Sequence, residues 1–160
     1  MKGLLTFLVS AGLSFSSAVS VSADPKPKGA TGASAQAVAN LYGGMTQTWK
    51  TCQGGIYYGP NWEAQAWCGK NPDNVGIGKW RVDNKGRVCH DLTWYWPNSD
   101  GYGSKQDGGE CISHVTDAEG NLWRSWPQDS EWWRATGSKS LNKGFTYKSK
   151  VRRAKRKMKL

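Results

Sequence analysis

From residue 45 onward, apolar and polar residues alternate in short runs, and clusters of Gly, Asn, Asp and Pro separate those runs. Alternation with a period of two is typical of strands that bury one face. The pattern predicts about eight strands, at Met45–Thr51, Gly55–Tyr58, Glu63–Cys68, Ile77–Asp83, Arg87–Trp96, Glu110–Thr116, Asn121–Trp126 and Glu131–Thr136. Tight turns between them favour a mainly β fold, a single antiparallel meander that closes into a small barrel, with two facing sheets as the alternative.

A short helix is predicted before the first strand, in the stretch "SAQAVANLYGG". Ser34 can cap its start, and Ala37, Val38 and Leu41 would share one face. The glycine pair at 43 and 44 is a typical helix end.

The segment "GKWRVDNKGRVCHDLTWYW" predicts a hairpin whose loop is Asn84–Lys85–Gly86, with Gly86 in the left-handed conformation. This loop sets the register, which pairs Val82 with Val88, Trp80 with His90, Gly78 with Leu92 and Lys79 with Asp91. One face of the hairpin then carries Trp80, Val82, Val88, Leu92, Trp94 and Trp96. We expect that face to point inward, because a slip of one residue would scatter these side chains. The following segment, Pro97–Gly109, is predicted to be a long polar loop, a common place for binding.

The start of the chain predicts export. Met1-Lys2 is basic, Leu4 to Val21 is apolar and uncharged, and Val21-Ser22-Ala23 is a small-residue cleavage site. These features are typical of a signal peptide over residues 1–23, cleaved after Ala23, rather than of an uncleaved membrane anchor. Residues 24–33 are rich in Pro, Gly and Ala and are expected to form a flexible lead to a β-rich domain over 34–137.

Positive charge is concentrated at the other end of the chain. Residues 24–138 hold eleven Lys or Arg against twelve Asp or Glu, whereas residues 139–160 hold ten Lys or Arg and no acid. Val151, Ala154 and Met158 would form a thin apolar stripe if this tail were helical; a disordered tail is the alternative. The stripe and the cations suggest docking on an anionic surface, through Lys150, Arg152, Arg153, Lys155, Arg156 and Lys157.

Four cysteines behind an export signal predict two disulfides in an oxidising compartment. Of the three possible connectivities we favour Cys52–Cys68 and Cys89–Cys111, because each pair would join neighbouring strands. A zinc site is not expected, since the sequence has no Cys-x-x-Cys and its two histidines lack finger spacing. We predict no metal and no cofactor.

Catalytic residues are sparse. Pairing Cys89 with Cys111 puts His90 opposite Glu110, and such a pair could act as a base, but no nucleophile is aligned with it. His90 is better explained as an inward residue beside Trp80. The sequence therefore favours a protein that is not an enzyme.

Ten tryptophans and six tyrosines are more than a core of this size can hide, although most would be core or rim packing. Aromatic rings beside arginines can stack on sugars or hold other ligands. The predicted ligand-binding residues are Trp80, His90, Trp94, Trp96, Arg124, Trp126, Trp133 and Arg134.

Several motifs together resemble a known family. They are Leu41-Tyr42-Gly43, Trp49, Gly78-x-Trp80, Arg87-x-Cys89, Trp94 and Cys111-x-x-His114, followed by a tryptophan near the last strand. This set resembles the small secreted bacterial proteins known as domain of unknown function 995, over about Ser34 to Gly137. The resemblance implies a periplasmic or exported β-rich domain. It implies no chemistry, because the family's activity is unassigned, and the basic tail would lie beyond the family.

We therefore expect a periplasmic or secreted binding domain for an envelope glycan or another anionic envelope component, such as lipopolysaccharide or an anionic lipid surface. The alternative is a protein–protein module, an inhibitor or an exported effector, whose basic tail engages an acidic partner. Nucleic acid is an expected partner only if the protein enters a host cell.

Overall fold

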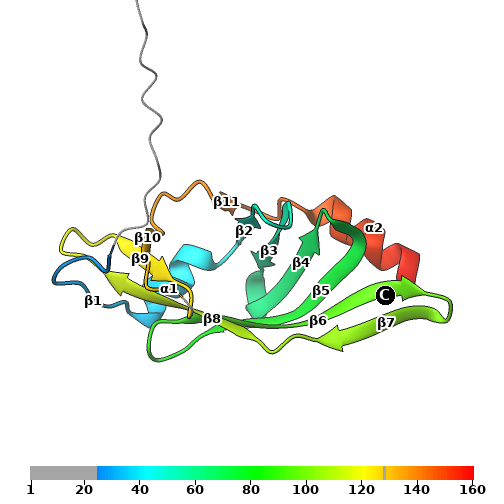
Figure 1. The fold of residues 1–160 in the computed structure, drawn as a ribbon, viewed down its shortest axis with the longest axis horizontal. Coiled ribbons are helices and arrows are strands. Elements are labelled where there is room, and N and C mark those ends of the chain that lie inside the picture. Colours follow the sequence, from blue (N-terminus) through cyan, green and yellow to red (C-terminus); the bar gives the residue numbers. More distant parts are fainter. Residues whose placement is uncertain (1–24, 128) are drawn as a thin grey trace, which may run out of the picture.

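The computed structural model describes residues 25–127 and 129–160. The predicted signal peptide lies outside the described residues. The chain forms an antiparallel sheet that curls into a half-barrel, with two short helices packed on it (Figure 1). The elements are β1 (Thr31–Gly32), α1 (Ala35–Tyr42), β2 (Met45–Trp49), β3 (Gly54–Tyr58), η1 (Pro60–Trp62), β4 (Glu63–Cys68), β5 (Asn71–Val82), β6 (Val88–Asn98), β7 (Gly101–Gln106), β8 (Glu110–Thr116), β9 (Leu122–Ser125), β10 (Trp133–Arg134), β11 (Leu141–Lys143) and α2 (Lys148–Met158).

Nine strands follow one another across the sheet in the order β10-β9-β8-β6-β5-β4-β3-β2-β11, while β1 pairs with β8 and β7 with β6. All the pairs are antiparallel, which confirms the predicted mainly β meander. The curvature is that of a half-barrel.

The N-terminal helix forms where the sequence predicts it. The Ser34 hydroxyl accepts a hydrogen bond from the Ala37 N–H at 3.1 Å, and Gly44 beyond the end of α1 has a φ of 76°. Val38 and Tyr42 are fully buried, and Ala37 and Leu41 are half-buried against the same core. This apolar side fixes α1 on one face of the sheet.

The hairpin of β5 and β6 has the predicted register. Trp80 pairs with His90, Val82 with Val88, Gly78 with Leu92 and Lys79 with Asp91. Gly86 adopts a φ of 67°, as the three-residue loop requires. The face that carries Trp80, Val88 and Leu92 is buried in the main core.

The prediction of a long loop over Pro97–Gly109 is wrong for most of its length, because residues 97–98 belong to β6 and only 99–100 and 107–109 lie outside strands. Residues 101–106 form β7, which pairs with β6 and extends the hairpin away from α1 (Figure 1). Gly103 lies opposite Trp96, and a Cβ on Gly103 would stand 2.7 Å from the indole ring. Gly103 therefore makes room for the Trp96 ring. In the sequence alone, a glycine placed for this reason cannot be told from a glycine that belongs to a loop.

The two faces of the sheet carry different cores. One cluster contains Ala66 and Trp80 and packs against α1, so we name its side the α1 face. The other contains Trp67 and Val75 and packs against α2, and its side is the α2 face. Adjacent residues 66 and 67 point to opposite faces, as the strand alternation requires.

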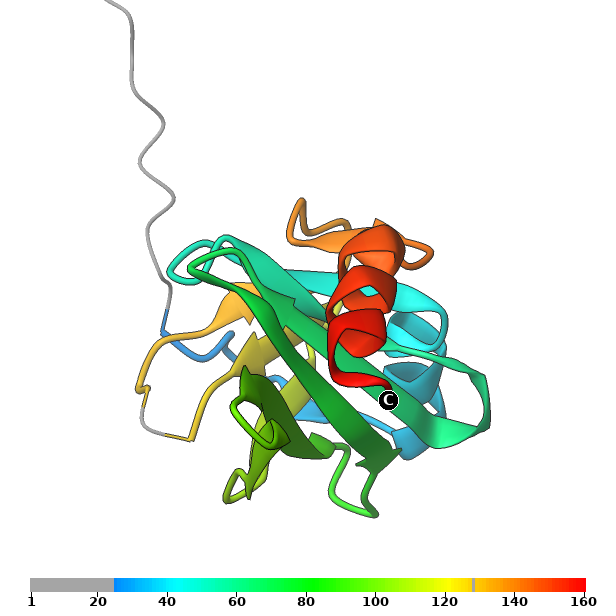
Figure 2. The same cartoon turned by 90° about the vertical axis from the view of Figure 1, so that its right-hand side faces the viewer.

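The basic C-terminal segment is helical from Lys148 to Met158, and Figure 2 looks toward it along the sheet. Its apolar stripe of Val151, Ala154 and Met158 is buried against Trp67 and Val75. The expectation that this stripe docks on an external surface is therefore wrong, because the protein's own sheet covers it. The segment also supplies β11, which pairs with β2.

Candidate ligand-binding groove

An open groove of about 700 Å³ lies on the α1 face, at the end of the strands away from α1. Its lining combines aromatic rings, a disulfide and polar side chains. The lining residues are Trp49, Cys52, Cys68, Asn71, Asn74, Trp94, Trp96, Lys105, Gln106, Asp107 and Gly108. Most of them lie at the ends of β2, β4, β6 and β7 or at the start of β5, while Cys52, Asp107 and Gly108 lie in the adjoining loops, so the curled sheet and its loops bring them together.

Trp94 and Trp96 project from β6 on the same side, because they are two residues apart in one strand. Trp94 is half-buried and packs partly against the main core, whereas Trp96 is 37% exposed. The Trp96 ring lies on the backbone of Gly103 in the neighbouring strand. The groove thus contains one anchored indole and one accessible indole.

Asp107, in the groove lining, accepts hydrogen bonds from two backbone N–H groups and from the Trp94 indole. Its Oδ1 accepts hydrogen bonds from the N–H groups of Leu92 and Gly109, each at 3.2 Å. Its Oδ2 accepts one from Trp94 Nε1 at 3.3 Å. The carboxylate therefore orients the Trp94 ring.

The disulfide Cys52–Cys68 forms part of the groove wall, and Cys89–Cys111 joins β6 to β8. Both pairs match the predicted connectivity. Two disulfides indicate an oxidising compartment outside the cytoplasm. Within residues 25–127 and 129–160, no helix is long and apolar enough to cross a bilayer.

Only two of the predicted ligand-binding residues, Trp94 and Trp96, line this groove. Trp80 and His90 are both 5% exposed in the core, and Trp80 Nε1 donates to the Gly59 carbonyl at 2.9 Å. α1 covers the end of the sheet that holds Trp80 and His90. Trp94 and Trp96 lie on the same face at the other end, and they are therefore more exposed than Trp80.

The remaining predicted residues lie on β9, β10 or next to them. Arg124 is buried, with Trp126 stacked 5.1 Å from its guanidinium carbon. Trp133 is half-buried, and Arg134 is exposed and donates to Asn121 Oδ1 at 2.6 Å. The structure does not bring these four residues to the groove.

A second recess, of about 500 Å³, lies between α1 and η1 and includes Trp62 and Trp80. Trp62 is 49% exposed, and its ring centre lies 4.6 Å from that of Trp80. Asn61 and Trp62 both have positive φ angles, 56° and 60°. Trp62 is thus a second accessible indole outside the groove, and it provides a matched comparison for Trp96.

His90 and Glu110 pair as predicted, with His90 Nε2 at 3.9 Å from Glu110 Oε2. Burial lowers the pKa of His90 and raises the pKa of Glu110, so both groups are shifted toward their neutral forms. In the described part of the chain, the buried His90 Nδ1 has no hydrogen-bond partner, and so no hydroxyl or thiol contacts it as a nucleophile would. The arrangement has the elements of a base but not of an activated nucleophile.

A polar cluster lies in the core, on the side where β8 and β9 face α1. The Tyr42 hydroxyl is 2.9 Å from His114 Nε2, and Arg124 Nη2 donates to Ser140 Oγ at 2.6 Å. Burial and the Arg124 charge lower the pKa of His114 to about 4. Burial also raises the pKa of Tyr42, against the opposing effect of Arg124. Both side chains are therefore neutral at physiological pH.

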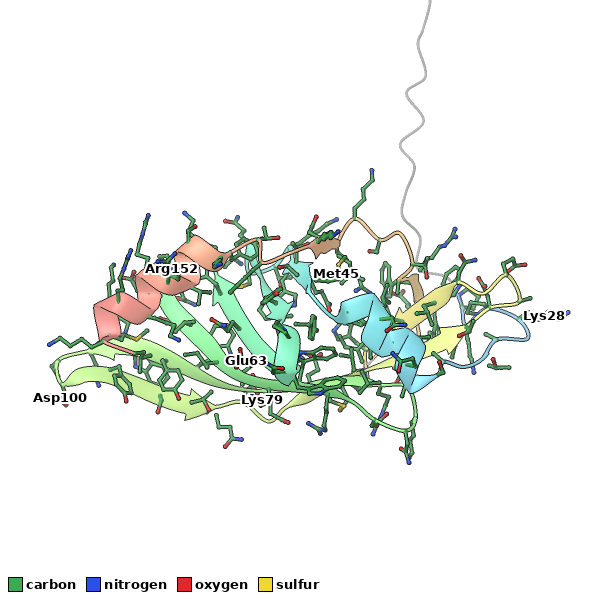
Figure 3. All side chains as sticks on the ribbon, turned by 180° about the vertical axis from the view of Figure 1, so that it is seen from behind. Lys28, Met45, Glu63, Lys79, Asp100 and Arg152 are labelled. Carbon is green, nitrogen blue, oxygen red and sulfur yellow. A yellow bond between two sulfur atoms is a disulfide. The ribbon has the colours of Figure 1, made fainter. Side chains whose placement is uncertain are left out.

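The outward side of α2 is strongly basic. Long side chains, with Arg152 among them, stand away from the sheet along the helix (Figure 3). The exposed cations in and just after the helix are Lys148, Lys150, Arg152, Arg153, Arg156, Lys157 and Lys159, while Lys155 is half-buried. Lys157 Nζ forms an ion pair with Asp73 at 2.6 Å. Five of the six predicted surface-binding cations are thus displayed to solvent.

Sequence reasoning missed several groove residues, notably Trp49, Asn71, Asn74 and Gln106. The clue available was the disulfide, because Cys52 and Cys68 bring the segments around them together. Asn71 and Asn74 lie in the first part of β5, which the alternating pattern does not reveal. Among the residues that the structure describes, no three His, Cys, Asp or Glu side chains are grouped to hold a metal.

Comparison with known proteins gives one result. No curated protein and no solved structure matches the chain. A family described as "Protein of unknown function (DUF995)" matches residues 10–150. The match runs past Gly137 to the first turn of α2, so the view that the whole basic segment lies beyond the family is wrong. Because the match covers most of its length, the chain belongs to the DUF995 family.

Proposed function

We propose that the protein is a non-enzymatic, periplasmic or secreted domain that binds an envelope glycan in the groove. The observation that carries this proposal is the combination in one open groove of the Trp94 and Trp96 rings with a polar rim. Ligand sites commonly combine an apolar floor with a few placed polar groups. Sugar rings fit such a lining because each has an apolar C–H face and a rim of hydroxyls.

The polar rim supplies complementary chemistry. Asn71, Asn74 and Gln106 carry amides that can both donate to and accept from sugar hydroxyls. Lys105, which is paired with Trp94 across the strands, adds a positive charge at the rim. This charge favours an acidic sugar over a neutral one.

The basic side of α2 would add a longer-range attraction to an acidic polysaccharide, lipopolysaccharide or anionic lipid surface. Each Lys or Arg near an anionic surface contributes about 1 kcal/mol before screening. Because the apolar stripe of α2 is already buried, this attraction would be electrostatic and strongly reduced by salt.

The test is to titrate the protein with a chitooligosaccharide as a neutral glycan and with alginate as an acidic one, following tryptophan fluorescence and heat. Trp96→Ala should weaken binding about tenfold or more, because an aromatic contact of this kind is worth ~1.4 kcal/mol. Trp62→Ala is the matched control, since it removes an exposed indole, at 49% against 37% for Trp96, that lies outside the groove. It should leave the affinity unchanged.

Replacing Arg152, Arg153, Arg156 and Lys159 with Gln tests the contribution of α2 while leaving its buried stripe intact. This variant should lose affinity for alginate but keep its affinity for the neutral oligosaccharide. An equal loss in Trp96→Ala and Trp62→Ala would argue against the groove. The absence of binding to both glycans would favour the alternative of a protein partner.

A further inference from the structure

Arg124 is a cation held in the interior of the half-barrel, apart from the groove. It is 5% exposed and lies on β9 opposite His114 of β8. Nη2 donates to Ser140 Oγ at 2.6 Å, and the Trp126 ring covers the guanidinium. The other two nitrogens, Nε and Nη1, are buried and have no hydrogen-bond partner among the described residues. Most of the hydrogen-bonding capacity of this side chain is therefore unused.

Within residues 25–127 and 129–160, no carboxylate forms an ion pair with Arg124. The ion pairs there are Arg81–Asp91, Arg87–Asp83, Lys157–Asp73 and the contact of His90 with Glu110. Its polar neighbours are neutral, because Tyr42 and Tyr58 have raised pKa values and His114 has a pKa of about 4. A guanidinium stays charged at any physiological pH. A buried charge without a partner is strongly unfavourable, so this site lacks one negative charge.

We propose that Arg124 binds a small carboxylate in the interior of the half-barrel, beside Tyr42 and His114. One carboxylate supplies the single negative charge that the site lacks, whereas a phosphate dianion would exceed it. Its oxygens would accept charge-assisted hydrogen bonds from Nε and Nη1, which are stronger than bonds between neutral groups. This inference is independent of the glycan proposal, since it uses none of the groove residues.

The test compares acetate with acetamide, two probes of nearly equal size that differ in charge. The protein is refolded with each probe, so that slow entry does not limit binding, and its Tm is measured at constant ionic strength set with chloride. Acetate should raise the Tm saturably, by about 5–10 °C at a hundred times its dissociation constant. Acetamide should not. Arg124→Met should abolish the response to acetate, while Arg134→Met, at an exposed arginine on the next strand, should keep it.

A second measurement covers the case in which Arg124→Met does not fold. In the wild-type protein labelled with ¹⁵N-arginine, the Nε–H resonance of Arg124 should shift downfield and saturate with acetate at the same concentration that saturates the Tm. The resonance is assigned with Arg124→Lys, or by its slow hydrogen exchange, because Arg124 is the buried arginine of the described chain. An equal effect of acetate and acetamide, or no saturable shift with acetate, would overturn the proposal and leave the guanidinium to buried water.

Discussion

His114 is a buried imidazole beside a fixed positive charge, and this position makes the stability of the protein depend on pH. Its pKa is about 4 in the folded protein, against about 6.5 in an unfolded chain. The unfolded chain therefore binds a proton first as the pH falls. The folded state keeps its full stability above pH ~6.5 and loses about 3 kcal/mol between pH ~6.5 and ~4 from this group. Urea denaturation at steps of pH measures the loss.

His114→Gln is the control, because glutamine keeps a polar side chain near Tyr42 but does not titrate in this range. Its stability should vary less between pH ~6.5 and ~4 than that of the wild type, by about the same 3 kcal/mol. The remaining slope would come in part from His90, whose pKa burial also lowers. Identical slopes in the two proteins would contradict the buried, neutral state of His114.

Single residues also show what the sequence pattern could not give. Trp80 and Trp96 were predicted to share one face, yet Trp80 is 5% exposed and Trp96 is 37% exposed. The period of the strand determines which face a side chain takes, but not whether another element covers that part of the face. Here α1 covers one end of the sheet and leaves the other open. The pattern therefore predicted Trp94 and Trp96 in the site but added six residues that lie elsewhere.

At the level of elements, α2 is attached to the sheet by its apolar stripe. Val151 is 1% exposed and packs in the cluster with Trp67 and Val75. Val151→Ala should lower the free energy of unfolding by about 1–2 kcal/mol, because it removes buried methyl groups and leaves a cavity. Arg152→Ala, at the next and exposed position, should change it by less than ~0.5 kcal/mol. Urea denaturation of both variants measures the difference, and equal small effects would mean that α2 is not docked in solution.

Three strands, β1, β7 and β11, were missed for different reasons. β1 has two residues, pairs with the distant β8, and lies in a stretch whose Pro, Gly and Ala content is typical of a flexible lead. β7 is specified by contact with Trp96 across the hairpin, which a reading of local composition cannot show. β11 has three residues and pairs with β2 almost a hundred positions earlier, so no local pattern marks it. The elements that were predicted well, such as α1 and the β5–β6 hairpin, are those whose signals are local: a cap, a turn and an alternation.

On the scale of the whole molecule, the two disulfides should differ in their effect on binding. Replacing either pair with alanine should lower the free energy of unfolding by about 3 kcal/mol, given loops of sixteen and twenty-two residues. Only the Cys52–Cys68 pair lines the groove. Its removal should therefore also weaken binding of the chitooligosaccharide, whereas removal of Cys89–Cys111 should not. Denaturation and glycan titration of the two double variants test this, and equal losses of binding would contradict it.

The fold class followed from the strand period, while the extent of curling did not, because it depends on the sum of many strand pairings. The connectivity of the disulfides was predictable because each pair joins strands that are neighbours in the meander, and Cys89 and Cys111 do face each other across β6 and β8. The groove was not predictable as a whole. Its residues come from several strand ends that only the curled sheet brings together.

The pairing of β2 with β11 has a consequence for the order in which the protein folds. Gln47 lies opposite Leu141, so one edge of the sheet is completed by residues near the end of the chain. Contacts between distant segments form late, because the entropy of closing a long loop must be overcome first. A chain that emerges from a membrane starting at its N-terminus could pair β2 with β3 early, but the other edge of β2 would stay unpaired until the last twenty residues arrive. Exposure of this strand, and not of the groove, would then set how long the new chain is vulnerable to aggregation and proteolysis.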